Sequence, residues 1–544
     1  MKHLLLICAS LFAATTALAQ ETYENAHLVT EDLNGTARYV GMGGAMEALG
    51  ADISVIGTNP AGIGLFRHST AHVSFGVVSQ QDGKSFANGN KTNMSFDQAG
   101  FVYSKRSGRN SFVNLAFNYH KSRNFDYILS ASDRLRNASQ NKLSYVKGLE
   151  GVFKLNVDRN GYVMSDDNTY SNTDYLNYNA LMSSYNADNE MVYNYYNADS
   201  YMLDRAHTGY IGEYDFNISG NVNDRVYWGL TFGISDVHYK AYGEYQEALV
   251  NANDQAMGNV LTCDERKITG TGFNVKAGVI FRPVEDSPFR IGFSVATPTW
   301  YDLTTNNHTV LYNNSTAGDM DRIGVDHSYD FKLYTPWKFG ASMGTTVGDY
   351  LAIGASYEYA DYAATDSRII TDSSYDWYYD EYWDNTSSDN TMNRHTENTL
   401  KGVSTVKVGL EMRPDSKMAF RVGYNYVSPM YEEQGFKDVT LNSPGTYVGS
   451  ATDYTNWKAT NRITCGFGYN IDKLSIDLAY QYSVQSGNFK PFLDYYASAN
   501  DGPELDNISN AVTVDNKRHQ VLLTLGYHFS YLVNLWRVEN KRYN

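Results

Sequence analysis

The feature that most constrains this chain is an alternation of apolar and polar side chains, which recurs in short runs from about Thr70 to Phe529. Side chains of a β-strand alternate between two faces, so each run separates an apolar face from a polar or small one. The final run shows this best, and its apolar face holds Val521, Leu523, Leu525, Tyr527 and Phe529. A soluble sandwich would bury that face, whereas a barrel in lipid would turn it outward. The chain is therefore predicted to be all-β, and the lengths of its turns discriminate between the two folds.

Fourteen runs can be assigned as strands, and short and long connections between them alternate without exception. The expected strands are 71–79, 97–105, 111–123, 209–219, 225–239, 270–282, 289–297, 337–347, 350–360, 403–413, 417–427, 462–470, 473–485 and 517–529. Outer-membrane barrels have short periplasmic turns and long outer loops, and a sandwich has no reason to separate loop lengths by end. We therefore predict a 14-stranded antiparallel transmembrane β-barrel with both termini in the periplasm. The connection 124–208 is unusually long.

The N-terminus is typical of an exported bacterial protein. Lys2 precedes an apolar run from Leu4 to Phe12, and Ala17-Leu18-Ala19 offers a cleavage site of small residues. We expect cleavage after Ala19 and a final location in the outer membrane. No later segment approaches the roughly 18 consecutive apolar residues of a membrane-spanning helix. Cys263 and Cys465 alone remain after cleavage, so the fold must form without a disulfide framework.

Composition and missing motifs narrow the function. The chain has 46 tyrosines, which suit a barrel because the ring can lie in lipid while the hydroxyl reaches the headgroups. The net charge of −16 argues against a nucleic-acid partner, since phosphate binding needs clustered Lys and Arg. G-x-S-x-G occurs once, at Gly340–Gly344, in the middle of an expected strand and not at the strand-to-helix turn that a hydrolase needs, and H-E-x-x-H does not occur. We expect no enzymatic activity, no cofactor and no bound metal.

The segment 20–69 does not alternate, and it is too apolar and glycine-rich to be a linker. Gly41, Gly43 and Gly44 do not complete a G-x-G-x-x-G motif, and no Lys-Ser/Thr pair follows them, so they do not form a phosphate-binding loop. Asn59-Pro60 indicates a turn. A segment with small residues and few charges can pack inside a barrel and close it, so we predict an N-terminal hatch in the lumen.

The run Ala37–Gly64 resembles the FadL/TodX family of outer-membrane transport proteins, in particular its Bacteroidetes branch, which is often described as hemin receptor-like. The similarity is carried by 38–45 and 59–62, and extends to 290–303, 335–338 and 421–426. The family fold is a 14-stranded barrel with a hatch in its lumen, as expected here from the strand count. The resemblance implies a hatch motif made of Gly41, Gly43, Gly44, Asn59, Pro60, Ala61 and Gly62.

The resemblance also implies passive uptake of hydrophobic molecules without a bound cofactor. In the family, long-chain fatty acids or aromatic hydrocarbons bind first in an apolar groove among outer loops and then in a barrel pocket, and a hatch movement opens the route. We expect that movement around Gly57–Gly64. The expected partners are a fatty acid-like ligand and outer-membrane lipid, and we expect a monomer.

By the order of the loops, the resemblance assigns the groove to the third and fourth outer loops. Glu244–Leu261 is predicted to form an amphipathic helix there, either as part of the groove or packed on neighbouring loops. Its candidate ligand-binding residues are Leu249, Val250, Met257, Val260 and Leu261.

Two other functions remain open. A haem receptor could use exposed histidines, and four lie in or near expected outer loops: His207, His308, His327 and His395. A barrel of this kind could instead bind cargo as a secretion shuttle, because fold does not fix function. The expected organisation is a signal peptide over 1–19, a hatch over 20–69, a barrel with long outer loops over 70–530, and a periplasmic tail over 531–544.

Overall fold

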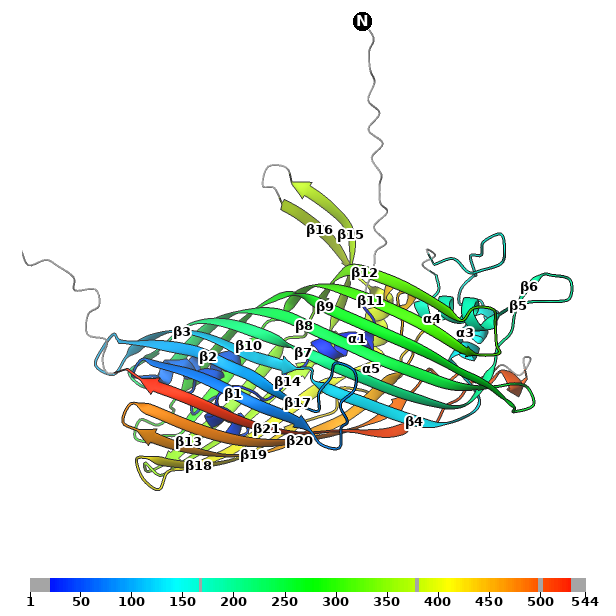
Figure 1. Cartoon of the computed structure of the whole chain (residues 1–544). Coiled ribbons are helices and arrows are strands. Elements are labelled where there is room, and N and C mark those ends of the chain that lie inside the picture. Colours follow the sequence, from blue (N-terminus) through cyan, green and yellow to red (C-terminus); the bar gives the residue numbers. More distant parts are fainter. Residues whose placement is uncertain (1–19, 166–168, 377–380, 498–501, 530–544) are drawn as a thin grey trace, which may run out of the picture.

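The wall of the protein is a closed sheet of antiparallel strands (Figure 1). The computed structural model describes residues 20–165, 169–376, 381–497 and 502–529, and no side chain is described within 372–383. The expected signal peptide and periplasmic tail lie outside the described residues. Among the described residues, no helix is both long enough and apolar enough to cross a membrane.

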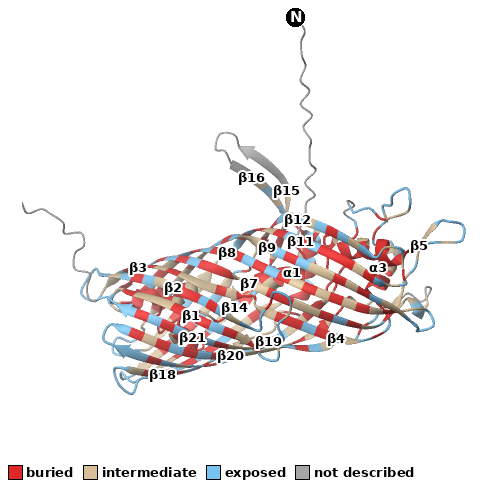
Figure 2. Ribbon diagram, viewed as in Figure 1, coloured by how far each residue is buried: buried red, intermediate tan, exposed pale blue. Residues whose placement is uncertain are grey.

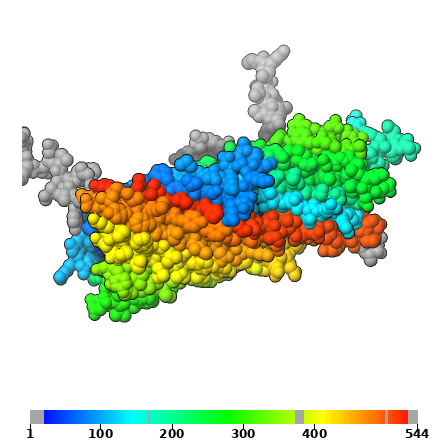
Figure 3. Space-filling view, turned by 60° about the horizontal axis from the view of Figure 1, so that its bottom comes forward, coloured from blue at the N-terminus to red at the C-terminus, as the bar shows by residue number. Residues whose placement is uncertain are grey.

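Fourteen strands close the barrel, as the sequence predicts. They are β1 (Thr70–Gln80), β2 (Thr92–Arg106), β3 (Phe112–Asn124), β7 (Asn197–Val222), β8 (Val226–Val250), β9 (Ala256–Phe281), β10 (Arg290–Ala296), β13 (Lys338–Val347), β14 (Leu351–Asp361), β17 (Gly402–Met412), β18 (Met418–Val427), β19 (Tyr454–Ile471), β20 (Leu474–Lys490) and β21 (Val512–His528). Each pairs with the next in this order, and the register of β1 with β21, from Thr70 opposite His528 to Gln80 opposite Arg518, completes the ring. Figure 3 shows these first and last strands side by side on the surface.

Burial alternates along the strands, and the apolar face points outward (Figure 2). In β21, Leu522 and Thr524 are buried while Leu523 and Leu525 are exposed, as the pattern predicts. Exposed apolar and aromatic side chains form a band around the barrel that includes Tyr214, Phe216, Trp228, Phe232, Trp300, Trp337, Phe339, Tyr357, Tyr424 and Tyr480. A surface of this kind needs lipid around it, so the barrel spans a membrane, with the short turns at one end and the long connections at the other. We call these the periplasmic end and the outer end.

Several strands continue beyond the apolar band toward the outer end, which corrects the sequence analysis. The predicted helix over Glu244–Leu261 is wrong, because β8 runs on to Val250, a short turn follows, and β9 starts at Ala256. The expected loop 240–269 is therefore mostly sheet. Inward residues still alternate there, but several of the outward ones, such as Lys240, Glu244 and Glu265, are charged because water replaces lipid around them. Because these outward residues are polar, the sequence pattern was assigned to a loop and not to strands.

Other connections extend the same sheet. The additional strands are β4 (Tyr127–Ala138), β11 (Trp300–Ser315), β12 (Arg322–Tyr334), β15 (Asp366–Asp376) and β16 (Glu381–Ser388). β10 and β11 are separated by Thr297–Thr299, and β12 and β13 by Thr335–Trp337, so one long hairpin is interrupted on both arms at a proline. The hairpin of β15 and β16 projects away from the wall (Figure 1). It is joined to β14 by the turn η4 (Tyr362–Ala364) and to β17 by α5 (Asn390–Thr399).

A cap of short elements covers the outer end. It contains α3 (Gln140–Leu149), α4 (Asn172–Asn177), the π-helical turn η3 (Tyr178–Met182), the small hairpin of β5 (Ser183–Tyr185) and β6 (Met191–Tyr193), α6 (Pro444–Tyr447) and η5 (Pro503–Leu505). Its apolar core joins residues of α3, α4 and η3 to inward residues of the outer strand ends, including Leu203 and Leu249. The long connection 124–208 is thus a folded cap in its described part.

The N-terminal segment lies inside the barrel, as predicted. It forms α1 (Thr22–Leu28), α2 (Ala37–Gly41) and the 3₁₀ turns η1 (Ile53–Gly57) and η2 (Pro60–Leu65). Gln20 lies near the outer end, where its amide oxygen accepts a hydrogen bond from the Tyr329 hydroxyl at 3.2 Å. The segment therefore starts near the outer end and runs down the lumen before β1 begins at the periplasmic end. The even strand count does not by itself place the mature N-terminus in the periplasm.

Candidate functional site: the hatch and the cavity beside it

The hatch, residues 20–69, packs its backbone directly against lumen-facing glycines of the wall. A Cβ at Gly229 would collide with the backbone of Pro60 and Ala61, and a Cβ at Gly409 or Gly423 would collide with the backbone around Met42. Wall glycines thus let the hatch approach more closely than any side chain would permit.

The two parts of the hatch motif lie on this glycine-lined surface. Gly43 and Gly44 have positive φ angles of 64° and 81°, so a tight turn needs glycine there. Asn59 caps η2 by accepting a hydrogen bond from the Ala61 amide at 3.1 Å, and Pro60 follows as the first residue of the turn. Ala61 and Gly62 are fully buried. Gly43, Asn59, Pro60 and Ala61 thus contact the wall closely, whereas the nearest neighbours of Gly44 and Gly62 are other hatch residues.

Ion pairs between hatch and wall add to this contact. Arg38 of α2 forms a bidentate pair with Glu411 of β17, at 2.9 and 3.1 Å, and Glu411 also accepts from Arg421 at 2.7 Å. Glu47 of the hatch pairs with Lys407 at 2.8 Å. Glu411, Glu47 and Lys407 are buried and Arg38 is partly buried, so removing one partner would leave a costly unpaired charge.

A cavity of about 290 Å³ lies in the lumen between the hatch and the outer elements. Aromatic rings from several elements line it: Tyr23, Tyr39, Phe125, Tyr127, Tyr239, Tyr362, Tyr431, Tyr454 and Trp457. Charged side chains line it too: Glu24, Glu31, Asp32, Arg123, Arg205, Asp264, Arg266, Lys338, Glu358, Lys407, Lys437, Asp453, Arg462 and Arg518. The site can therefore accept an apolar body and also meet a polar or charged group.

One part of the cavity is strongly basic. Arg123 of β3, Arg462 of β19 and Arg518 of β21 surround the hatch residue Asp32, at 3.1, 3.8 and 4.0 Å. The Asp32 carboxylate also accepts a hydrogen bond from the Asn124 amide at 2.9 Å. Although burial acts to raise it, the three guanidinium groups hold the pKa of Asp32 below its usual range.

The outer part of the cavity is formed by α1. The Tyr23 ring stacks on Tyr431 with centroids 5.2 Å apart, and its hydroxyl donates to Asn456 at 2.7 Å. His27 faces His207 of β7, with ring centroids 5.5 Å apart. Burial, and then the charge of Arg123, lowers the pKa of His27 to about 4, so the imidazole is neutral at physiological pH.

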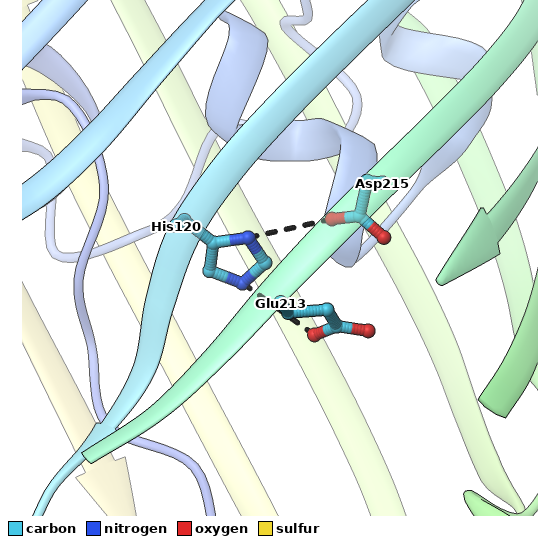
Figure 4. A group of neighbouring side chains, drawn as sticks. All are labelled: His120, Glu213 and Asp215. Carbon is cyan, nitrogen blue, oxygen red and sulfur yellow. Dashed lines mark ion pairs between the residues drawn. The ribbon is translucent and has the colours of Figure 1, made fainter. Parts of the chain in front are cut away.

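A second polar cluster lies on the wall under the hatch (Figure 4). The His120 imidazole faces the carboxylates of Glu213, at 3.6 Å, and Asp215, at 3.3 Å. These three residues have the composition of a metal site. However, the Lys276 ammonium already contacts both carboxylates, at 2.6 and 3.3 Å, and takes the place that a cation would need. The cluster is therefore a salt-bridge network, close to Gly57 of the hatch.

The five residues predicted for the loop groove lie at the outer ends of β8 and β9. Leu249 and Val260 point inward and are buried in the core of the cap. Val250, Met257 and Leu261 are partly exposed near the same hairpin end. None of the five lines the cavity described above, so they do not form one site with the basic group.

The four candidate haem histidines are also dispersed. His207 lines the cavity, and His395 is buried in α5, where it contacts Thr22 at 2.9 Å. His308 is exposed on β11 beside Asp326, and His327 lies on β12. The structure therefore brings these four residues to no common site.

Sequence reasoning missed the basic group. Arg462 and Arg518 occupy inward positions of predicted strands, so the strand pattern could have revealed them. Arg123 could not be found in this way, because a register shift between Lys121 and Arg123 changes the face on which it lies. Asp32 lies in a segment without periodicity, and only the three-dimensional structure brings it to the arginines.

Comparisons with known proteins find similarity in structure and not in sequence. No known family's sequence pattern and no curated protein matches the chain. The structure is similar to that of a Pseudomonas aeruginosa FadL homologue, with 12% identity, a TM-score of 0.49, and coverage of 92% of this chain and 100% of that one. It is also similar to the Ralstonia pickettii toluene transporter TbuX, with 12% identity, a TM-score of 0.46, and coverage of 92% and 99%.

The Pseudomonas putida toluene transporter TodX gives 10% identity, a TM-score of 0.45, and coverage of 92% and 99%. Each of these chains is thus covered almost completely.

Proposed function

We propose that this protein is an outer-membrane channel for passive uptake of hydrophobic molecules, and that its hatch gates the channel. The observation that carries the proposal is the lumenal cavity, which is lined by aromatic rings and lies beside the hatch. The sequence resemblance to FadL/TodX proteins supports the substrate class. We further propose that the protein works as a monomer, because the sheet closes within one chain.

The hatch is the part that would have to move. The motif around Asn59 packs tightly on wall glycines, whereas 30–34 borders the cavity and contacts the wall through one backbone hydrogen bond, from the Asp32 amide to the Ser122 carbonyl at 2.8 Å, and through side chains. We therefore place the moving part at 29–36 and not at Gly57–Gly64. A ligand in the cavity would contact this segment directly. No energy source is needed if the ligand moves down its own gradient.

A reversible cross-link tests the gate. The Gln520 side-chain amide on β21 donates to the Asn34 side-chain oxygen at 3.2 Å, so Asn34→Cys with Gln520→Cys can join residues 29–36 to the wall through a short thiol cross-linker, in a background with Cys263 and Cys465 replaced by serine. We expect cross-linking to stop flux of an apolar fluorescent probe into liposomes, and reduction to restore it. The matched control is Thr304→Cys with Asp330→Cys, an exposed pair on β11 and β12. Unchanged flux in the cross-linked hatch variant would refute gating.

The ligand itself can be identified by native mass spectrometry of barrel purified from its own membrane. A co-purifying fatty acid or aromatic hydrocarbon would support uptake of hydrophobic molecules. Haem or a protein partner in its place would favour the haem receptor or the secretion shuttle.

A further inference from the structure

One edge of strand β12 has no partner strand over most of its length. On one side β12 pairs with β11 throughout. On the other side it pairs with β15 only at Lys332, Leu333 and Tyr334. Among the described residues, the backbone of 322–331 makes no backbone hydrogen bond except those with β11. The edge from 322 to 331 is therefore open, although proteins generally pair or cover such edges to prevent association.

The projecting hairpin of β15 and β16 begins on this open edge. Arg368 of β15 lies opposite Lys332, and the same register carried one residue further places Ile369 opposite Phe331. Opposite residues of an antiparallel pair lie on the same face of the sheet, so Ile369 would meet Phe331 inside the wall. Phe331 is fully buried in an apolar cluster, whereas Ile369 is only half-buried in the projecting hairpin. Continued pairing therefore buries further apolar surface of Ile369.

The length of β15 also matches the open edge. β15 has 11 residues, and a β-bulge at Thr371 shifts its register with β16 by one residue and bends the strand. With the bulge retained, β15 would run along β12 from Tyr334 to Val325, and Ser373 would lie opposite Ser328. The hairpin thus provides a strand of the right length and direction for an edge that has no other partner strand among the described residues.

The base of the hairpin ties its two strands together and to the wall. The Arg368 guanidinium donates to the Ser388 hydroxyl at 2.9 Å and to the Thr386 carbonyl at 3.1 Å, both on β16. It also donates at 2.8 Å to the Asp366 carboxylate, which accepts from Asn393 of α5 at 2.6 Å. Beyond this base the hairpin projects away from the wall (Figure 1). The bulge lies just beyond the base, so both strands can swing together about that point.

A small crevice lies beside the open edge. Tyr329 of β12 lines it together with Gln20 and Lys437. Glu24 and Arg266 line both this crevice and the large cavity, so the two spaces adjoin. The open edge of β12 is therefore a place where the outer wall is incomplete next to the lumen.

We propose that β15 pairs with the open edge of β12, and that the hairpin of β15 and β16 is a side lid of the outer wall. With the hairpin projecting, the edge and the crevice beside it are open. With the hairpin paired, β12 becomes an interior strand and the crevice is closed from the side. This inference goes beyond the proposed function, because it concerns the outer wall and holds whether or not the hatch gates the lumen.

Engineered disulfides test the pairing in the full-length barrel in liposomes, with Cys263 and Cys465 replaced by serine. Ser373→Cys with Ser328→Cys joins two positions that pairing brings to about 5 Å between Cα atoms, within reach of a disulfide. The matched control is Ser373→Cys with Asn306→Cys, because Asn306 lies opposite Ser328 on β11, one strand further away and roughly 10 Å from position 373 in the paired state. We expect oxidation to link the first pair within one chain about tenfold faster than the second.

Hydrogen exchange gives a second readout without new cysteines. Replacing 371–385 by an Asn-Gly turn keeps the base of the hairpin, since Ile370 and Thr386 lie directly opposite each other. Amides of 322–331 should exchange about fivefold or more faster in this variant, because the lid no longer protects the edge, while amides of β14 keep their protection. No linking of the first pair, equal linking of both pairs, a disulfide between two copies, or unchanged exchange at 322–331 would each overturn the lid. Heat-modifiable migration on gels shows that each variant is folded.

Discussion

The close contact between hatch and wall gives a prediction that can be worked from the structure. In Gly423→Ala, the new Cβ would stand 2.7 Å from the Cα of Gly43, and closer still to two other backbone atoms of the hatch. An ordinary contact needs at least 3.4 Å and the closest hatch atom, the Gly43 nitrogen, would lie at 2.2 Å, so hatch and wall must separate by about 1.2 Å. Neither partner can yield by rotating a side chain, because both sides of the contact are backbone.

The separation has an energetic cost that is specific to the hatch. Overpacking of a tight contact costs about 1–3 kcal/mol. The hydrogen bond from Asn425 to the Gly43 carbonyl is already 3.3 Å long and would be lost, which adds about 1 kcal/mol. We therefore expect hatch docking to weaken by about 2–4 kcal/mol, so that opening near Gly43 becomes roughly 30- to 1,000-fold more frequent.

Native-state hydrogen exchange measures this opening directly. The amides of Val40, Met42, Gly43 and Gly44 donate to hatch carbonyls, so their exchange reports on this turn. They should exchange faster in Gly423→Ala, while amides of β18 keep their protection. The control is Gly324→Ala on β12, where the nearest atom lies 3.3 Å from the added Cβ and the hatch is distant. If folded Gly423→Ala exchanged at 40–44 at a rate within twofold of wild type, the conclusion that wall glycines are needed for close docking of the hatch would be refuted.

Three further predictions concern other contacts. Arg38→Gln should lower the free energy of unfolding by about 1–3 kcal/mol in thermal melts, because Glu411 loses its bidentate partner but keeps Arg421. Since Arg421 also depends on the Glu411 carboxylate, the double variant Arg38→Gln with Glu411→Gln should not regain stability. A double variant as stable as wild type would contradict this shared network. Lys142→Met should accelerate hydrogen exchange at 503–507 without affecting the barrel strands, because the Lys142 ammonium donates to the Asn137, Glu504 and Asp506 carbonyls at 2.6–2.8 Å. Unchanged exchange would show that the cap does not depend on these hydrogen bonds. His27 has a pKa of about 4 in the folded protein, below its ordinary 6.5, so protonation favours the unfolded chain as the pH falls. The free energy of unfolding should therefore fall by about 1–2 kcal/mol between pH 6.5 and pH 4, after allowance for water in the cavity. His27→Gln should flatten this part of the profile of stability against pH, and an equal slope in both proteins would contradict the prediction.

The barrel itself could be predicted because its determinants are local and periodic. Each membrane-spanning strand repeats an outward apolar face. Leu523 and Leu525, for example, are exposed at the positions that the sequence pattern predicts to face outward. The outer extensions of β8 and β9 obey the same inward alternation, but their outward residues are polar, so a search for apolar faces ends too early. The error over Glu244–Leu261 follows from this change of solvent along a single strand.

The candidate site was less accessible to sequence reasoning. The hatch motif at Asn59–Gly62 was found through turn chemistry and resemblance, and the structure places Asn59, Pro60 and Ala61 against wall glycines that lie far away in sequence. The contact of Asp32 with Arg462 and Arg518 spans more than 400 residues and depends on how the ring closes. No periodicity encodes such a contact, whereas the inward positions of the two arginines could have been recognised as unusual.

The outer extension of the sheet also affects how the protein survives at the cell surface. The residues of β8 from Tyr239 to Val250 rise about 3.3 Å each along a tilted strand, so the rim stands on the order of 30 Å above the lipid. Proteases bind their substrates as unpaired, extended chain, and here both edges of β8 are already engaged by β7 and β9. Limited proteolysis of intact cells should therefore cut this hairpin at its turn, 251–255, and spare its arms, which gives the entrance a durability that a loop of equal length would lack.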